Sequence, residues 1–237
     1  MIAIIDGDVL LYMSIWGVDS QSEARQKFDQ LFNNTLEGVF AKDYVMALGG
    51  PDNFRVSLYP DYKGNRKKSK STRPDWFLDL KSEIAEQYEG CILTDNCEAD
   101  DMIRVWANEC SAFNKDYIVV SVDKDLDCIV GKHYNPRKEL IYTIDEEYAE
   151  YFYWKQILMG DPTDNIPGLP KIGPKKAESL LNNSKDFRDT VCKEYHKFYG
   201  KEGYSYLITN GRLIHIWRFI DDHFKVKREI YDKAISG

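Results

Sequence analysis

Short apolar runs recur in the first half of the chain and alternate with longer segments of helical pattern. The apolar runs are residues 2–5 (IAII), 44–48 (YVMAL), 91–93 (CIL) and 117–122 (YIVVSV). Continuous apolar runs of this length, rich in β-branched residues, are typical of strands buried on both faces of a parallel sheet. The helical segments lie near 20–40, 74–89 and 98–110. Strand alternating with helix predicts an α/β fold.

Acidic residues follow three of these four predicted strands. The first strand leads into Asp6, the third into the EADD sequence at 98–101, and the fourth into Asp123 and Asp125. In open α/β sheets, ligands bind beyond the carboxyl ends of the strands. Carboxylates that are far apart in the sequence are therefore expected to meet at one edge of the sheet.

Carboxylates gathered in this way favour a divalent cation among them, because like charges at short range raise one another's pKa. Hard carboxylate ligands without His or Cys select Mg²⁺ or Mn²⁺ over Zn²⁺. Two such ions about 3.5 to 4 Å apart form the usual site for in-line phosphodiester cleavage. Each acid alone has a structural alternative, since an Asp after a strand often begins a turn, and Glu98 with Asp101 could complement a helix N-terminus.

Composition indicates a globular protein, with 43% hydrophobic and 30% charged residues, and argues against a disordered or fibrous chain. Five cysteines without a CxxC pair argue against a disulfide framework and a zinc site. The apolar first fifteen residues have no basic leader and are too short to span a bilayer. We therefore expect a protein of the cytoplasm, or of the host cytoplasm if the chain is viral, without membrane association.

The net charge of −7 is unexpected for a protein that binds a polyanion. The charges are unevenly distributed, however, because one stretch without acidic residues contains six basic residues. They are Lys63, Arg66, Lys67, Lys68, Lys70 and Arg73. This stretch predicts either a nucleic-acid contact or a solvated basic loop.

Five motifs occur along the chain in a fixed order. They are IIDGD at 4–8, DYKGNR at 61–66, EADD at 98–101, SVDKDLD at 121–127 and GDPTDNIPGLPKIGPKKA at 160–177. Through them the chain resembles, over residues 2–180, the flap endonuclease and 5′ to 3′ exonuclease family, and most of all its small bacteriophage members. The resemblance implies an α/β fold in which a parallel-sheet 5′-nuclease (PIN-like) core has helices on both faces and a C-terminal helix-hairpin-helix type DNA-binding module follows.

The resemblance also implies a set of metal-binding carboxylates. They are Asp6, Glu98, Asp100, Asp101, Asp123, Asp125, Asp161 and Asp164. The family usually has a further Asp at the end of the second strand, whereas LGGPDNFR offers only Asp52, closer to Arg55 than usual, so Asp52 ranks below the others. Asp8 and Asp127 are additional acids, which we interpret as turn residues or as hydrogen-bonding partners around the metal ligands.

For the basic stretch, the resemblance implies an arch near residues 62–90. Tyr62 would stack on a base near the scissile bond, while Lys63 and Arg66 would contact the scissile phosphate. An aromatic face accepts any base, and two cations can stabilise charge on phosphate oxygens. The neighbouring basic residues are expected to contact DNA; they are Lys67, Lys68, Lys70 and Arg73.

Residues 166–181 predict a turn followed by a helix, because Gly168 and Gly173 permit a tight backbone and Pro174 suits a first helical turn. Exposed amides and lysines at such a helix start can bind phosphate without reading sequence. The expected DNA-binding residues here are Gly168, Lys171, Gly173, Lys175 and Lys176. The resemblance adds a monovalent cation such as K⁺ at the 166–174 turn.

Together these features predict a nuclease core over residues 1–155 and a DNA-binding and packing region over 156–237. The expected activity is that of a monomeric, structure-specific 5′-nuclease with two Mg²⁺ or Mn²⁺ ions. Its expected substrates are DNA flaps, nicks, gaps and free 5′ ends, and RNA paired to DNA. Two alternatives stay open: a PIN-type ribonuclease, and a catalytically inactive protein that binds DNA junctions.

Overall fold

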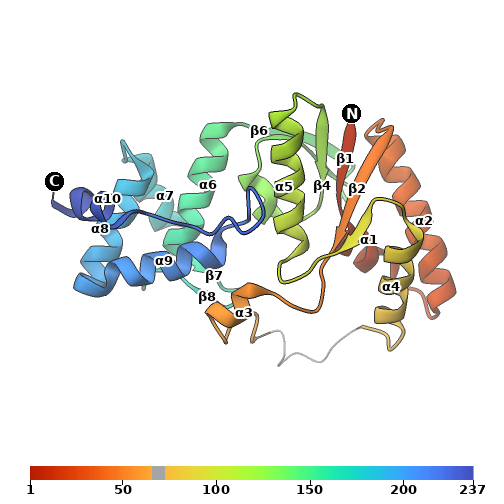
Figure 1. The fold of residues 1–237 in the computed structure, drawn as a ribbon, viewed down its shortest axis with the longest axis horizontal. Helices are drawn as coiled ribbons and strands as arrows, with labels where there is room; N and C mark the ends of the chain where they lie inside the picture. Colours follow the sequence, from red (N-terminus) through yellow and green to blue (C-terminus); the bar gives the residue numbers. More distant parts are fainter. Residues whose placement is uncertain (66–72, 237) are drawn as a thin grey trace. The chain divides into compact units, whose positions relative to one another are not determined.

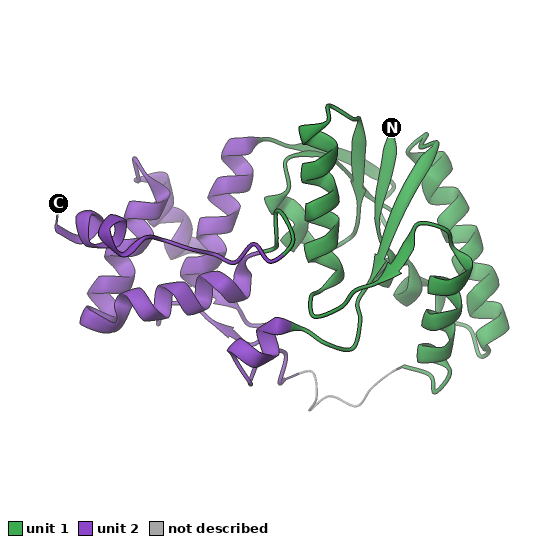
Figure 2. Cartoon of the chain, viewed as in Figure 1, with its two compact units in different colours: residues 1–53, 72–145, 216–220 green, residues 54–71, 146–215, 221–237 purple. Residues whose placement is uncertain are grey.

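The computed structural model describes residues 1–65 and 73–236 (Figure 1). The chain forms two compact units, each built from several stretches of sequence (Figure 2). Unit 1 comprises residues 1–53, 72–145 and 216–220, and unit 2 comprises residues 54–71, 146–215 and 221–237.

Unit 1 contains a mostly parallel six-stranded sheet in the order β3-β2-β1-β4-β5-β6. Its strands are β1 (Ile2–Asp6), β2 (Asp43–Leu48), β3 (Cys91–Leu93), β4 (Tyr117–Val120), β5 (Gly131–Asn135) and β6 (Leu140–Ile144). Ile2 lies opposite Asp43 in β2 and Tyr117 in β4. Only β6 runs antiparallel, against β5. The four predicted strands are confirmed, and their carboxyl ends point to the same edge.

Helices cover both faces of this sheet, as the family resemblance implied (Figure 1). They are α1 (Gly7–Ser14), α2 (Gln21–Gly38), α4 (Phe77–Gln87) and α5 (Ala99–Ala112), with a 3-10 turn, η2 (Lys124–Cys128). Ala3 and Ile5 of β1 pack in one buried cluster with residues of α1, α2 and α4. Ile4 points to the opposite face because side chains alternate along a strand, and α5 packs there against β1, β2 and β4.

Unit 2 is mainly helical. Its elements are α3 (Phe54–Leu58), α6 (Glu146–Met159), β7 (Gly160–Asp161), β8 (Ile166–Pro167), α7 (Pro174–Asn182), α8 (Phe187–Tyr199), η3 (Gly200–Glu202), α9 (Gly203–Ile214) and α10 (Arg228–Ser236). Helix α7 begins at Pro174, which confirms the predicted helix start. A second buried cluster, with Trp154, Tyr195 and Tyr231, forms the core of this unit.

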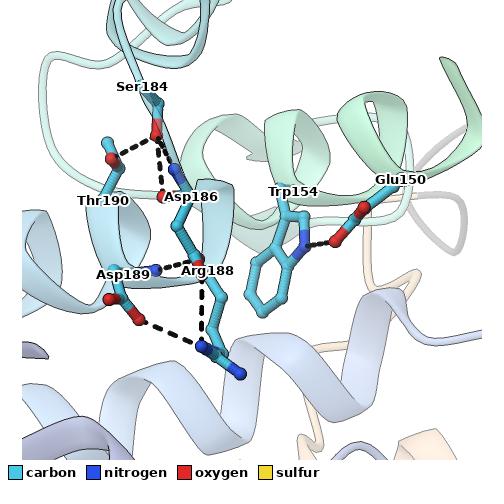
Figure 3. Close-up of polar contacts among 7 residues, drawn as sticks. All are labelled: Glu150, Trp154, Ser184, Asp186, Arg188, Asp189 and Thr190. Carbon is cyan, nitrogen blue, oxygen red and sulfur yellow. Dashed lines mark hydrogen bonds and ion pairs between the residues drawn. The ribbon is translucent and has the colours of Figure 1, made fainter. Parts of the chain in front are cut away.

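The start of α8 shows how local polar contacts set a helix boundary in unit 2 (Figure 3). Asp186 precedes the helix and its Oδ1 accepts a hydrogen bond of 2.9 Å from the amide of Asp189. Arg188 forms an ion pair of 3.2 Å with Asp186, and Ser184 lies 2.6 Å from the Thr190 hydroxyl. Asp186 thereby satisfies an amide that a helix start leaves without a partner, so we assign this acidic group a structural role.

None of the helices in the described part of the chain is both long and apolar enough to cross a bilayer.

Candidate functional site

Asp6 is the last residue of β1, a central strand of the sheet in unit 1. It lies at the edge of the sheet where the parallel strands end, which we call the acidic edge. Its Oδ1 accepts a hydrogen bond of 3.2 Å from the amide of Val9 and so caps α1. Its Oδ2 accepts one of 2.7 Å from the hydroxyl of Ser121. Burial, followed by the charge of Asp8 and more weakly that of Asp123, raises the pKa of Asp6 to about 7. Asp6 is thus a buried carboxyl at which a cation would relieve an unfavourable charge.

A chain of hydrogen bonds links Asp6 to the acids that follow β4. The hydroxyl oxygen of Ser121, which donates to Asp6, accepts a hydrogen bond of 2.9 Å from the amide of Asp123. Asp123 Oδ1 in turn accepts one of 2.9 Å from the amide of Asp125 and caps η2. Asp6 after β1 and Asp123 after β4 are thus neighbours in unit 1, and the charge of Asp123 contributes weakly to the raised pKa of Asp6. Ser121 is a positioning residue that the sequence reasoning missed, although it lies within the SVDKDLD motif.

The EADD sequence begins α5, and two of its acids cap that helix. Glu98 and Asp101 form a capping box, in which the amide of Glu98 donates to Asp101 at 3.0 Å. Asp101 is fully buried and also accepts a hydrogen bond of 3.0 Å from the amide of Trp217. Glu98 and Asp101 thus cap the N-terminus of α5, the structural role that their spacing allowed. The same hydrogen bonds hold their carboxylates in place.

Asp100 and Asp125 both act electrostatically on Cys128, a buried residue of η2. Burial raises the pKa of the Cys128 thiol to about 11; Arg104 opposes this effect, and the charges of Asp100 and Asp125 add to it. Both carboxylates must therefore lie near Cys128. The starts of α5 and η2 thus place one acid from each of two predicted motifs in the neighbourhood of the same buried thiol.

Within the described residues, no three His, Cys, Asp or Glu side chains are already placed closely enough to hold a metal ion. Hydrogen bonds to amides and to Ser121 set the carboxylate positions instead. The chemistry of the donors still fits a hard divalent cation, since the candidate ligands are all carboxylates. The raised pKa of Asp6 has the direction that a bound cation would reverse.

The additional acids have separate partners. Asp8 Oδ1 pairs with Lys81 at 2.7 Å, and its Oδ2 accepts a hydrogen bond of 2.9 Å from the amide of Gly49. Asp127 accepts one of 3.0 Å from the hydroxyl of Tyr142, while burial raises its pKa. Asp52 is exposed in the loop after β2. Its role as a metal ligand stays a prediction.

Asp161 and Asp164 lie in unit 2, on the hairpin formed by β7 and β8. Asp161 Oδ1 accepts a hydrogen bond of 2.7 Å from the amide of Thr163 and shapes the turn. Asp164 is 9% exposed, and its Oδ2 lies 3.1 Å from the Tyr62 hydroxyl and 3.4 Å from Lys63 Nζ. The assembly of all eight carboxylates into one centre stays a prediction, since six lie in unit 1 and two in unit 2.

The ring of Tyr62 is buried in the core of unit 2, with 3% of the residue exposed. In this structure the ring is not available to a base, in contrast to the expected stacking role. The sequence could not show this burial, because it depends on packing against helices more than 90 residues further along the chain. The structure points instead to the hydroxyl of Tyr62, which donates to Asp164.

Only part of the expected arch near 62–90 lies in the described residues. Arg66, Lys67, Lys68 and Lys70 fall outside them. Arg73 lies over the rings of Tyr12 and Phe77, at 5.2 and 5.0 Å from the ring centres. Residues 77–87 form α4, which packs on the core of unit 1.

The hairpin that precedes α7 depends on two glycines. Gly160 has a φ of +69°, and a Cβ there would lie 2.3 Å from the amide nitrogen of Gly168. A Cβ on Gly168 would lie 2.1 Å from the carbonyl carbon of Met159. Helix α6 leads directly into this hairpin, and residues 168–173 connect the hairpin to α7. Four of the residues predicted to contact DNA are exposed around the start of α7. They are Lys171, Gly173, Lys175 and Lys176.

Sequence comparison decides the family of this protein. Residues 1–153 match the family model described as the 5′-3′ exonuclease, N-terminal resolvase-like domain. The chain belongs to this 5′-3′ exonuclease family. The expectation drawn from the five motifs is thereby confirmed.

Several curated proteins are similar to this 5′-3′ exonuclease family member. DNA polymerase I of Rhizobium leguminosarum is 35% identical over 153 residues, which cover 59% of this chain and 15% of the polymerase. Flap endonuclease Xni of Shewanella halifaxensis is 31% identical over 147 residues, 56% of each chain. A 5′-3′ exonuclease of Buchnera aphidicola is 28% identical over 206 residues, 79% of this chain and 72% of the relative. The match thus spans about half or less of the first two relatives.

Solved structures confirm the fold of this family member. The bacteriophage T5 D15 flap endonuclease, in a pseudo-enzyme-product complex with DNA and metal ions, superposes with a TM-score of 0.77 at 18% identity, covering 99% of this chain and 96% of that one. The catalytic core of Rad2 in complex with DNA substrate gives a TM-score of 0.51 at 16% identity, covering 85% and 66%.

Proposed function

We propose that this chain is a structure-specific 5′-nuclease that hydrolyses DNA phosphodiester bonds with two Mg²⁺ or Mn²⁺ ions, as a 5′ to 3′ exonuclease, a flap endonuclease or both. One observation carries the proposal: the buried Asp6, joined through Ser121 to Asp123 at the carboxyl edge of a parallel sheet. Its family and the DNA and metal complexes of its structural relatives support it.

The metal ligands proposed in unit 1 are Asp6, Glu98, Asp100, Asp101, Asp123 and Asp125, with Asp161 and Asp164 in unit 2 and Asp52 as a weaker candidate. When bound, the cations supply a water of lowered pKa and neutralise charge on the scissile phosphate. Helix caps and Ser121 hold four of these carboxylates in place, those of Asp6, Glu98, Asp101 and Asp123. Lys63 and Arg66 are proposed to stabilise charge on the phosphate oxygens.

The proposed substrates are DNA flaps, nicks, gaps and free 5′ ends, bound by a monomer mainly through the phosphate backbone. Contacts to phosphate tolerate either ribose or deoxyribose in the strand, so RNA paired to DNA is also a proposed substrate. Lys171, Lys175 and Lys176 are proposed to hold the duplex, with a K⁺ ion at the 166–174 turn. The five cysteines are free thiols, which supports a reducing compartment such as the cytoplasm.

A direct test incubates three 5′-labelled DNAs, a flap, a nicked duplex and a blunt duplex, with the purified chain in Mg²⁺ or in EDTA, and sizes the first product. We expect cleavage at or near the 5′ end or junction in Mg²⁺, and none in EDTA. Asp123→Asn serves as the inactive control, and a single-stranded RNA tests the PIN-type alternative. Cleavage of that RNA alone, or binding without any cleavage, would overturn the proposal.

A further inference from the structure

Two short segments of unit 2, residues 61–65 and 161–165, are joined by hydrogen bonds in both directions; we call this pair the clasp. The amide of Lys63 donates to the carbonyl oxygen of Asp164 at 2.8 Å. The side chain of Asn65 donates to the carbonyl of Pro162 at 2.8 Å, and that of Asn165 donates to the carbonyl of Asp61 at 2.7 Å. The clasp thus fixes the DYKGN sequence against the DPTDN sequence.

At the centre of the clasp, two adjacent residues contact the same carboxylate oxygen. The Tyr62 hydroxyl and Lys63 Nζ lie 3.1 and 3.4 Å from Asp164 Oδ2. The Tyr62 ring is held by the core of unit 2, so its hydroxyl is fixed. Lys63 has a φ of +53°, a conformation rare for a residue with a side chain. The hydrogen bond from its backbone amide to the carbonyl oxygen of Asp164 holds that conformation, and the ammonium group reaches the carboxylate of the same residue.

We propose that Tyr62 is a positioning residue for Asp164, and that Lys63 is a replaceable cation that leaves Asp164 when a divalent ion binds. This inference rests on the proposed function. A neutral hydroxyl can keep donating to a carboxylate that binds a metal, and such outer hydrogen bonds orient metal ligands. An ammonium group at the same oxygen is repelled by the metal, and its release frees Lys63 for a phosphate group. The two neighbours therefore have opposite effects on metal affinity.

Tyr62→Phe tests the positioning role, with the metal affinity of the whole chain measured by Mn²⁺ calorimetry in the absence of DNA. The ring still fills the core while the donor to Asp164 is lost, and we expect Mn²⁺ to bind roughly tenfold more weakly at the affected site. Tyr195→Phe is the matched control, because Tyr195 is buried in the same core and its hydroxyl donates to the carbonyl of Ile157 at 2.8 Å. Equal Mn²⁺ affinity in the two variants would overturn the positioning role.

Lys63→Met tests the replaceable cation. We expect Mn²⁺ to bind severalfold more tightly, because the competing charge is gone, although cleavage is slower. Lys63 Nζ lies 5.1 Å from the centre of the Tyr62 ring. Lys155→Met is the matched control, since Lys155 Nζ lies 5.3 Å from the centre of the Tyr151 ring and pairs with Glu178 at 3.9 Å. Weaker Mn²⁺ binding in Lys63→Met, or the same change in both variants, would rule out displacement.

A double-mutant comparison locates both effects at Asp164. In an Asp164→Asn background, Tyr62→Phe and Lys63→Met should no longer change Mn²⁺ affinity, because the shared carboxylate is absent. Persistence of either effect would contradict the inference. If the unmodified chain bound Mn²⁺ and cleaved DNA while the variants matched their controls, only this inference would fail. If it neither bound Mn²⁺ nor cleaved DNA, the proposed function would fail first.

Discussion

At the scale of residues, Asp6 shows how a site residue can oppose folding. Its pKa is about 7 in the fold against an ordinary value of 3.8, mainly through burial. The folded state therefore holds the proton more tightly than the unfolded chain, and stability present at low pH is lost as pH rises towards 7. At ~1.4 kcal/mol per pKa unit, the loss is on the order of a few kcal/mol.

Asp6→Asn should therefore stabilise the metal-free protein at pH 8 and have much less effect at pH 5. The amide removes the buried negative charge while nearly preserving the shape of the side chain. Urea unfolding in EDTA at the two pH values measures this difference, with the exposed Asp116→Asn as control. Adding Mg²⁺ at pH 8 should raise the stability of the unmodified chain more than that of Asp6→Asn. A stability gain in Asp6→Asn that did not depend on pH would contradict the linkage.

At the scale of elements, the hydrophobic pattern predicted the parts of the fold whose signal is local. The four buried strands and the start of α7 at Pro174 follow from apolar runs and from the fixed φ of proline. Strands β5 and β6 escaped prediction, because GKHYN and LIYTI mix polar with partly exposed apolar residues. The burial of Tyr62 and the bridging role of Ser121 depend on distant packing partners, which no local pattern contains.

The start of α7 carries its own prediction. Replacing Lys175 and Lys176 together with Ala should weaken binding to a DNA duplex and reduce the slope of log K against log salt concentration by up to about 0.9 per lost phosphate contact. The rate of cleavage at saturating DNA should hardly change, because neither lysine is proposed to touch the scissile phosphate. Titrations at several salt concentrations measure the slope, with the exposed Lys185→Ala and Lys193→Ala pair as control. An unchanged slope would remove α7 from the proposed DNA-binding surface.

At the scale of the whole molecule, a net charge of −7 must be reconciled with the proposed polyanionic substrate. The sequence separates the charges: acids follow the strands of unit 1, while lysines gather in a basic stretch and around the start of α7. Long-range repulsion from the acids should slow the approach of DNA unless cations offset it. Metal binding and DNA binding are then expected to reinforce each other, since each reduces the electrostatic cost of the other.

This coupling predicts that Ca²⁺, a divalent ion that protein carboxylates commonly bind, tightens DNA binding more than its ionic strength alone explains. Fluorescence anisotropy with a labelled flap DNA, in Ca²⁺ or in EDTA with NaCl matched for ionic strength, should show severalfold tighter binding in Ca²⁺. In Asp123→Asn combined with Asp125→Asn, DNA should bind more tightly in EDTA, and the gain from Ca²⁺ should shrink, because two charges facing the ion are gone. If Ca²⁺ left the DNA affinity of the unmodified chain unchanged, a metal bound among these acids could not be what offsets their repulsion of DNA.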